Sequence, residues 1–300
     1  MKNKRTSKTQ LINFAPGSYF ERTSRPVYAV VFLLPFIIFY EFGTILINTD
    51  VLNQSQVRVV AFIWLQNLLE QIGFAYKLTW IAPPLAVIII LIALQITSGK
   101  KWTITPIDLP PMALECILLA VPLIVLNLSL NTSAIPRQNP RPSENTAKVF
   151  VHQPLTKCAA DTVPALQSEN HSQTSRDHSL MANIVTGIGA GIYEELIFRL
   201  ILICLLMILF QDFLRLSRKH SIMLAVLISA ALFSAHHHII FLDGRFGQSA
   251  AFNWLEFGFR TLAGIYFAVL FAVRGFAVTA GTHAFYDIIA TLVNAYFFQQ

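Results

Sequence analysis

The sequence predicts an all-α fold, a polytopic bundle of transmembrane helices with about seven spans and one interfacial amphipathic helix. Of the 300 residues, 55% are hydrophobic and only 13% are charged, and the mean hydropathy is +0.57. A soluble domain does not keep this much apolar surface away from water. Apolar stretches recur along the whole chain, and open strands are excluded because lipid cannot satisfy their backbone groups.

Seven apolar stretches are long enough to cross a bilayer, since a span needs about 20 mostly apolar residues. An eighth segment, roughly 57–75, mixes charged and amide side chains with aromatic and aliphatic ones. We expect it to lie in the membrane interface. No internal repeat supports an inverted-repeat transporter. The expected spans are roughly 27–48, 77–98, 112–131, 183–210, 221–241, 253–273 and 276–297.

Basic residues between the spans predict the orientation, because Lys and Arg accumulate in short cytosolic loops. With the N-terminus in the cytosol, the basic residues after the second, fourth and sixth spans all fall inside. These residues are Lys100 and Lys101, then Arg215, Arg218 and Lys219, and finally Arg274. We expect an integral, multi-pass protein of a bacterial plasma membrane. Its parts are a cytosolic basic tail (1–26), N-terminal membrane helices (27–131), a polar extramembrane loop (132–182) and a C-terminal membrane core (183–297).

The formal net charge of +6 does not indicate a nucleic-acid partner. The basic residues form short clusters between apolar runs, not a stripe with interleaved aromatic residues. The predicted partner is membrane lipid. Three cysteines are an odd count without C-x-x-C spacing, so neither a disulfide framework nor a zinc knuckle is indicated.

Ionisable residues inside a span are functional candidates, because charge is costly in hydrocarbon. The fourth span contains Glu194, Glu195 and Arg199. Glu195 and Arg199 are four residues apart and share a helix face, so they can neutralise each other. Glu194 is rotated by about 100° from its neighbour and is left to act as a general base. The alternative is a buried ion cluster that only holds helices together.

Two other spans contain histidines, near the end of the fifth span and early in the seventh. His236, His237 and His238 follow one another near the end of the fifth span. They point in three directions on a helix, so only one can face a given neighbour. We expect His236 and His238 to be simply packed or solvated residues. In the seventh span, His283 and Asp287 share a face, and Asp287 can orient His283 or share its proton. The alternative for this last pair is a polar contact that only stabilises the helix.

Other acids in the spans have simpler interpretations. Glu41 lies in the first span without a base nearby in the sequence, so we expect it to be protonated or paired with another helix. Glu256 and Arg260 are four residues apart and are expected to form a structural pair. Neither they nor Glu115 define a reaction.

Together and in this order, the three motifs resemble the CAAX-protease and bacteriocin-processing family of intramembrane endopeptidases, which includes the Rce1-type prenyl proteases. That family carries E-E-x-x-x-R, F-x-x-x-H, and H-x-x-x-N or a variant of it, each on a membrane helix. In this chain they are Glu194-Glu195-x-x-x-Arg199, Phe233-x-x-x-His237 and His283-x-x-x-Asp287. The resemblance covers roughly 183–291 and selects His237 from the three histidines.

The resemblance implies a hydrolase similar to CAAX prenyl protease 2, acting on membrane-associated peptides or lipidated proteins, prenylated ones among them. Glu194 and His237 would activate a water, while His283 and Asp287 would stabilise the oxyanion or polarise the carbonyl. Supporting roles would fall to Glu195, Arg199 and Phe233. Family members often have Asn in place of Asp287. Because an ionised Asp only accepts hydrogen bonds, Asp287 would have to be protonated or to orient His283.

Zinc chemistry is the alternative to a glutamate-activated water. Glu194, His237, His283 and Asp287 together offer mixed nitrogen and oxygen ligands for zinc. No H-E-x-x-H spacing is present to preorganise two ligands on one helix. We therefore expect no cofactor, with zinc as the alternative.

Two functions from other classes stay open at this point. One is a non-catalytic membrane scaffold or immunity-type protein, and the other is a proton-coupled transporter that uses Glu194 and the histidines as a relay. The expected boundaries also place His237 nearer the outer surface than Glu194 and His283. For these residues to meet, the fifth helix has to extend further outward, or the helices have to tilt.

Overall fold

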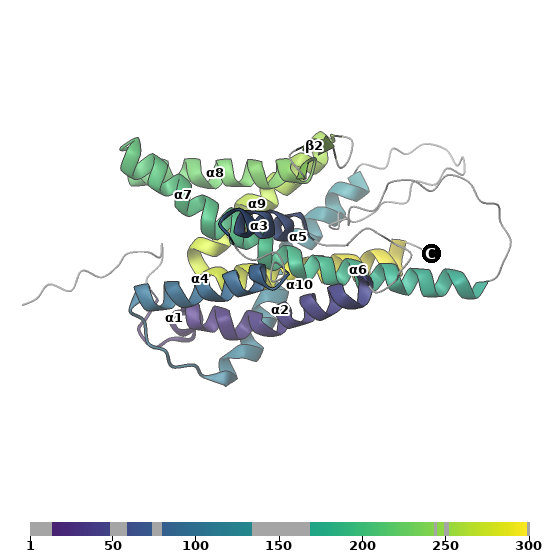
Figure 1. Ribbon diagram of the computed structural model, residues 1–300, viewed down its shortest axis with the longest axis horizontal. Helices are drawn as coiled ribbons and strands as arrows, with labels where there is room; N and C mark the ends of the chain where they lie inside the picture. Colours follow the sequence, from purple (N-terminus) through teal and green to yellow (C-terminus); the bar gives the residue numbers. More distant parts are fainter. Residues whose placement is uncertain are drawn as a thin grey trace, which may run out of the picture.

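A computed structural model of the chain describes residues 14–48, 59–73, 80–133, 169–242, 245–248 and 252–298. This part of the chain is a bundle of helices with one small hairpin (Figure 1). The long helices are α2 (Pro26–Asn48), α4 (Ala82–Ser98), α5 (Leu109–Ser133), α6 (Glu169–Glu195), α8 (Arg218–His236), α9 (Trp254–Arg274) and α10 (Phe276–Val293). The predicted helical-bundle fold class is confirmed.

The shorter elements connect or extend these helices. Strands β1 and β2 pair antiparallel, with Ile239 opposite Gln248. The short helices are α1 (Tyr19–Thr23), α3 (Val60–Gln71), the 3₁₀-helix η2 (Pro106–Asp108) and α7 (Ile203–Met207). The π-helices are η3 (Leu196–Leu202), η4 (Ile208–Phe213) and η5 (Asn294–Phe298), and the strands are β1 (Ile239–Leu242) and β2 (Arg245–Gln248).

Among the described residues, six stretches are long and apolar enough to cross a membrane. They coincide with six of the seven predicted spans. The remaining one corresponds to α4, which has 17 residues and is therefore about 25 Å long, somewhat shorter than the roughly 30 Å hydrocarbon core. The chain is an integral multi-pass membrane protein.

Several boundaries differ from the prediction. The fourth span was expected over 183–210, and the apolar stretch runs from Leu180 to Phe213, while the helix α6 itself already begins at Glu169. The expectation that the fifth helix continues to 241 is wrong, because α8 ends at His236 and β1 begins at Ile239. The longer fifth helix that would have brought His237 to Glu194 is therefore absent.

The segments outside the spans agree in part with the prediction. The amphipathic segment predicted over 57–75 contains α3, which packs against α4 and α6. Its place in the membrane interface stays a prediction. Residues 1–13 of the predicted basic tail and 134–168 of the predicted loop lie outside the described residues.

A buried arginine ties the N-terminal helix α1 to the end of α9. Arg274 is 5% exposed and forms an ion pair with Glu115, with Nη2 2.8 Å from Oε2. It also donates to the carbonyl oxygen of Phe20 at 3.1 Å and to the hydroxyl of Thr23 at 2.9 Å. Tyr19 donates to Glu115 at 2.9 Å. A residue that the sequence suggested only as an orientation signal therefore joins three helices of the fold.

Two expectations about acids outside the motifs are confirmed. Tyr193 of α6 donates a hydrogen bond to Glu41 of α2 at 3.2 Å, so Glu41 is paired with another helix. Arg260 and Glu256 of α9 form an ion pair at 3.2 Å. The first contact joins α6 to α2, the second lies within α9, and both lie outside the three motifs.

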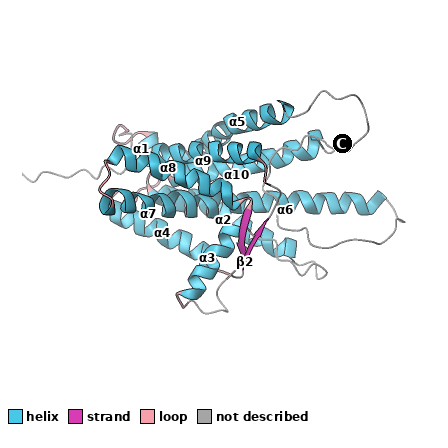
Figure 2. Ribbon diagram, turned by 90° about the horizontal axis from the view of Figure 1, so that it is seen from above, coloured by secondary structure: helices cyan, strands magenta, loops and turns pink. Residues whose placement is uncertain are grey.

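α6 and α10 lie side by side and approach each other closely where α6 carries glycines (Figure 2). A Cβ on Gly191 would lie 2.6 Å from the backbone nitrogen of Ala284 and 2.8 Å from the carbonyl oxygen of Ala280. A Cβ on Gly187 would lie 2.6 Å from the Cβ of Asp287. The two glycines are four residues apart and share the face that meets α10, a spacing common where membrane helices approach closely. The next turn of α6, which carries the two acids, is thereby held against α10.

Gly191→Ala is expected to lower the free energy of unfolding by about 1–3 kcal/mol, because the added methyl group meets backbone atoms of α10. The measurement is thermal unfolding of the purified protein in detergent. The matched control is Gly258→Ala in α9, where an added Cβ has no atom within 4 Å. That control should leave Tm unchanged or raise it slightly, since Ala favours a helix more than Gly. An equal Tm for the two variants would contradict the close packing.

Candidate active site

The three predicted motifs meet in the interior of the bundle, where α6, α8 and α10 contact one another. Glu194 and Glu195, the last residues of α6, are both 0% exposed. His236 ends α8, and His237 is its C-cap. His283 lies on α10 and is also buried. Each motif therefore contributes to one buried polar cluster.

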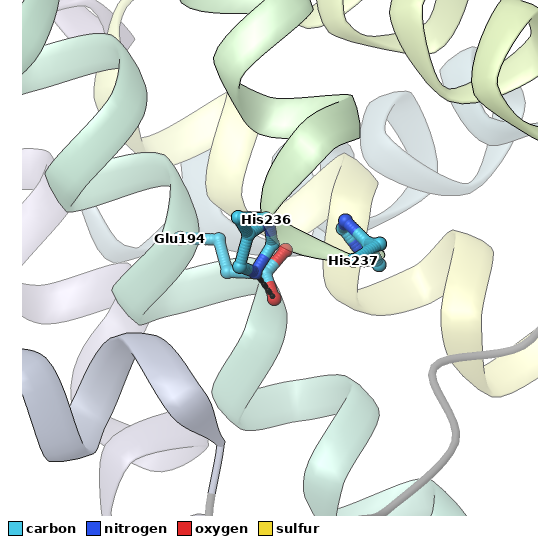
Figure 3. A group of neighbouring side chains, drawn as sticks. All are labelled: Glu194, His236 and His237. Atoms are coloured by element: carbon cyan, nitrogen blue, oxygen red, sulfur yellow. Dashed lines mark ion pairs between the residues drawn. The ribbon is translucent and has the colours of Figure 1, made fainter. Parts of the chain in front are cut away.

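Glu194 points toward His236 (Figure 3). The Oε1 atom of Glu194 is 3.3 Å from Nε2 of His236. The ring of His237 packs edge-on against that of His236, with centroids 4.1 Å apart. The family motif selects His237, yet the direct contact with Glu194 is made by His236, which the sequence suggested only as a packed or solvated residue.

One backbone atom orients both rings. Nδ1 of His236 and Nδ1 of His237 lie 2.8 Å and 2.9 Å from the carbonyl oxygen of Phe233. A carbonyl oxygen only accepts, so Nδ1 carries the proton in each ring, and Nε2 of a neutral ring is an acceptor. The expectation that only one histidine can face Glu194 assumed a continuing helix. His236 makes the direct contact with Glu194, and His237, which follows the end of α8, lies beside His236.

His238 has the packing role that the sequence suggested. It is buried and lies against the rings of Phe252 and Phe257, at centroid distances of 5.1 Å and 6.2 Å. Burial lowers the pKa of its imidazole below the ordinary value, because the charged form is poorly solvated there. The residue adjoins the site without contributing to it.

Glu195 links Arg199 to His283. Its Oε2 lies 3.1 Å from Nε of Arg199, so the predicted ion pair is confirmed. Its Oε1 accepts a hydrogen bond from Nδ1 of His283 at 2.7 Å. The guanidinium of Arg199 also lies 4.1 Å from the ring centroid of Phe233. Glu195 and His283 are 88 residues apart, so no local spacing in the sequence indicates this contact.

His283 presents its other nitrogen to Asp287. Nε2 of His283 lies 3.7 Å from Oδ2 of Asp287, which is within ion-pair range but too long for a hydrogen bond. The imidazole stacks on Phe267, with centroids 4.6 Å apart and planes at 17°. The predicted proximity of His283 and Asp287 is therefore observed, and the orientation of His283 is set mainly by Glu195 and Phe267.

A π-helix follows the two acids directly. η3 carries Arg199, and its Phe198 carbonyl oxygen accepts a hydrogen bond from Ser229 of α8 at 2.7 Å. π-helical turns occur frequently at functional sites and where helices change direction. Beyond η3 the chain leaves the line of α6 toward α7 (Figure 1). The end of α8 reaches Glu194 through His236, without the longer helix that the sequence predicted.

The side chains that can share a metal ion differ from the predicted set. In the part of the chain that the structure describes, one group of three offers ligand atoms within 4.8 Å of one another: Glu194, His236 and His237. The predicted zinc set contained His283 and Asp287 in place of His236. Those two residues are engaged with Glu195 and with each other.

A comparison with known families supports the same region. A family model described as type II CAAX prenyl endopeptidase, Rce1-like, matches residues 176–289. The resemblance drawn from the motifs is confirmed for this region. The Rce1-like region contains all the residues of the three motifs and all the contacts of the site described above. No curated protein and no solved structure matches the chain.

Within the Rce1-like region, Glu195→Gln is expected to lower the free energy of unfolding by about 3–5 kcal/mol. The substitution leaves the guanidinium of Arg199 buried without its carboxylate and weakens the contact with His283. The measurement is Tm in detergent. Glu256→Gln is the control, because its pair with Arg260 is partly exposed, at 24% and 18%, and contributes less than about 1 kcal/mol. Similar Tm losses in both variants would show that Glu195 is not an essential neutralising group.

Proposed function

We propose that this protein is an intramembrane endopeptidase that hydrolyses peptide bonds of membrane-associated proteins with a water activated by Glu194. The observation that carries the proposal is a fully buried carboxylate, on a membrane helix, 3.3 Å from the imidazole of His236. The Rce1-like match supports the reaction class. Prenylated proteins are the first substrate class to test, because the matched family is described by that activity.

In the proposed reaction a water bridges Glu194 and His237. A water that makes two hydrogen bonds of about 2.8 Å at a tetrahedral angle joins atoms about 4.6 Å apart. The ligand atoms of Glu194 and His237 lie within 4.8 Å. In the proposed reaction Glu194 takes a proton as this water attacks the carbonyl carbon. The neighbouring Nε2 of His236 is an acceptor that can take this proton from Glu194. In the proposed reaction the proton then passes to the peptide nitrogen as the C–N bond breaks, so that the amine product leaves neutral.

The second half of the proposed reaction uses His283. Glu195 accepts from its Nδ1, and Asp287 lies 3.7 Å from its Nε2. Two carboxylates favour the doubly protonated ring, whose Nε2–H can donate to the oxyanion of the tetrahedral intermediate. Asp287 then supports a cationic His283 and does not need to donate a hydrogen bond itself. With this role, Asp287 can take the place of the Asn that family members often have at the last motif position.

The orientation is part of the same proposal. We place the N-terminus in the cytosol, because Lys100, Lys101 and Arg215 lie in short connections at one set of helix ends. Arg274 lies at the end of α9 that belongs to the same set. Short basic connections remain predominantly on the cytosolic side.

Glu194→Gln is expected to lower the rate of peptide cleavage by about 10²–10⁴-fold, because the amide cannot take a proton from water. The measurement is cleavage of a prenylated peptide by the protein in proteoliposomes. Glu256→Gln is the matched control and should keep the full rate. Normal cleavage by the Glu194 variant would refute the role of Glu194. Loss of substrate uptake in that variant, with no proteolysis by the parent protein, would favour a transporter.

Exhaustive chelation is expected to leave the cleavage rate unchanged, because the proposed reaction needs only side chains and water. The measurement compares the rate before and after chelation, together with the metal content of the purified protein. A rate that disappears and returns only with added zinc would overturn glutamate activation in favour of metal chemistry.

A further inference from the structure

We propose that the outer edge of strand β1, the edge that faces away from β2, binds the substrate peptide as an extended strand. Backbone hydrogen bonds along this edge hold the peptide beside the cluster of Glu194, His236 and His237. The inference rests on the proposed function, because it describes how the same site takes up its peptide.

The register of the hairpin shows which backbone groups of β1 point outward. Leu242 lies opposite Arg245, and two residues separate them in the sequence. The pair that flanks a two-residue connection exchanges both backbone hydrogen bonds, and such pairs alternate along an antiparallel ladder with pairs that exchange none. Leu242 therefore bonds to β2, and so does Ile240. The N–H and C=O groups of Ile239 and Phe241 point to the outer edge.

The outer edge of β1 is a template for another strand. In the part of the chain that the structure describes, the sheet has two strands, so no third described strand covers this edge. An edge strand presents a row of N–H and C=O groups that pairs readily with an extended peptide. Each residue carries one donor and one acceptor. Ile239 and Phe241 can therefore form two hydrogen-bonded pairs with a bound strand.

A peptide substrate has a physical reason to occupy this edge. Inside a helix each carbonyl oxygen accepts a hydrogen bond from the same chain, so the bond to be cleaved has to leave the helix before water can attack its carbonyl carbon. Near hydrocarbon, the freed N–H and C=O groups are costly unless they find new partners. The edge of β1 supplies such partners. It thereby stabilises the extended form of the peptide that the proposed reaction needs.

The edge lies next to the proposed site of hydrolysis. β1 begins at Ile239, two residues after His237, so the two residues are at most about 7 Å apart. The hairpin lies at the end of α8 (Figure 1). A paired strand lies about 4.8 Å from its neighbour. A peptide on the outer edge of β1 therefore passes close to His237, which holds the attacking water in the proposed reaction.

The start of β1 is held in place by α8 and α9. The backbone N–H of His238 donates to the carbonyl oxygen of Ala235 at 3.0 Å, and its buried ring packs against Phe252 and Phe257. The hydroxyl of Ser234 donates to the carbonyl oxygen of Phe257 at 2.8 Å. These contacts fix the residue before β1, so a strand paired with β1 is positioned relative to the site as well.

The substrate side of the pairing is tested with prenylated peptides that each carry one backbone N-methyl group away from the bond to be cleaved. A paired strand uses its N–H groups at every second residue. We therefore expect KM to rise about three- to tenfold at two positions that are two residues apart, and to change little at the position between them. The Kd of these peptides for Glu194→Gln, which should bind without cleaving, should show the same pattern.

The protein side is tested with Phe241→Pro, which removes an outward N–H of β1 and no hydrogen bond of the hairpin. Proline is tolerated at such edge positions. The variant should raise KM about three- to tenfold, and Phe241→Ala, which keeps the N–H, should raise it less. Phe246→Pro is the matched control, because Phe246 lies directly opposite Phe241 and its N–H points to the outer edge of β2. It should leave KM unchanged.

A combination of the two tests assigns the pairing to β1. The N-methyl groups should cost less in Phe241→Pro than in the parent protein, because both changes act on the same hydrogen-bonded strand pair. Fully additive effects of the two changes would place the sensitive part of the peptide elsewhere on the protein and would overturn the proposal.

The two proposals fail in different ways. A period of three or four residues in the N-methyl series, no sensitive position, or equal KM values for Phe241→Pro and Phe246→Pro would overturn the strand pairing. Peptides that bind to Glu194→Gln with the two-residue period, while the parent protein cleaves none of them, keep the pairing and remove the proposed function. Cleavage without the two-residue period does the reverse, and a chain that neither binds nor cleaves the peptides loses both.

Discussion

The site depends on the close packing of α6 against α10. Between membrane helices the hydrophobic effect contributes little, so contact is held by close van der Waals packing and by interhelical hydrogen bonds. Both are present here within two turns. Gly191 leaves no room for a side chain against the backbone of α10, and one turn later Glu195 accepts from Nδ1 of His283 at 2.7 Å. Because Gly191 has no side chain, α10 comes close enough to α6 for the imidazole of His283 to reach Glu195.

The same packing separates the tasks of two adjacent acids. Consecutive residues of a helix point about 100° apart, so when Glu195 faces α10, Glu194 faces the end of α8. The cluster of Arg199, Glu195, His283 and Asp287 balances its own charge if His283 is protonated, which is the condition under which buried charges are tolerated. Glu194 stands outside this balance. Its charge is compensated by its histidines or by a transferred proton.

Local patterns in the sequence predicted the parts of this structure that depend on one segment. Apolar runs gave the spans, and a separation of four residues predicted the ion pair of Glu195 with Arg199. The contacts that complete the site join distant segments, as Glu195 does with His283. The end of α8 at His236 was also missed, because the apolar run in the sequence continues beyond it. Because the predicted helix continued beyond His236, its periodicity placed the histidines in different directions, whereas the rings of His236 and His237 lie against each other.

Phe233 connects the two halves of the site. Its carbonyl oxygen holds His236 and His237, while its ring lies 4.1 Å from the guanidinium of Arg199 and 5.9 Å from the centroid of His283. Any residue supplies a carbonyl oxygen, so the histidine contacts do not require an aromatic side chain. The ring does, because it covers a buried cation with a polarisable face. The aromatic position of the F-x-x-x-H motif is therefore explained by the buried cation on η3 and by the edge-on packing of the Phe233 ring against His237, with centroids 5.1 Å apart.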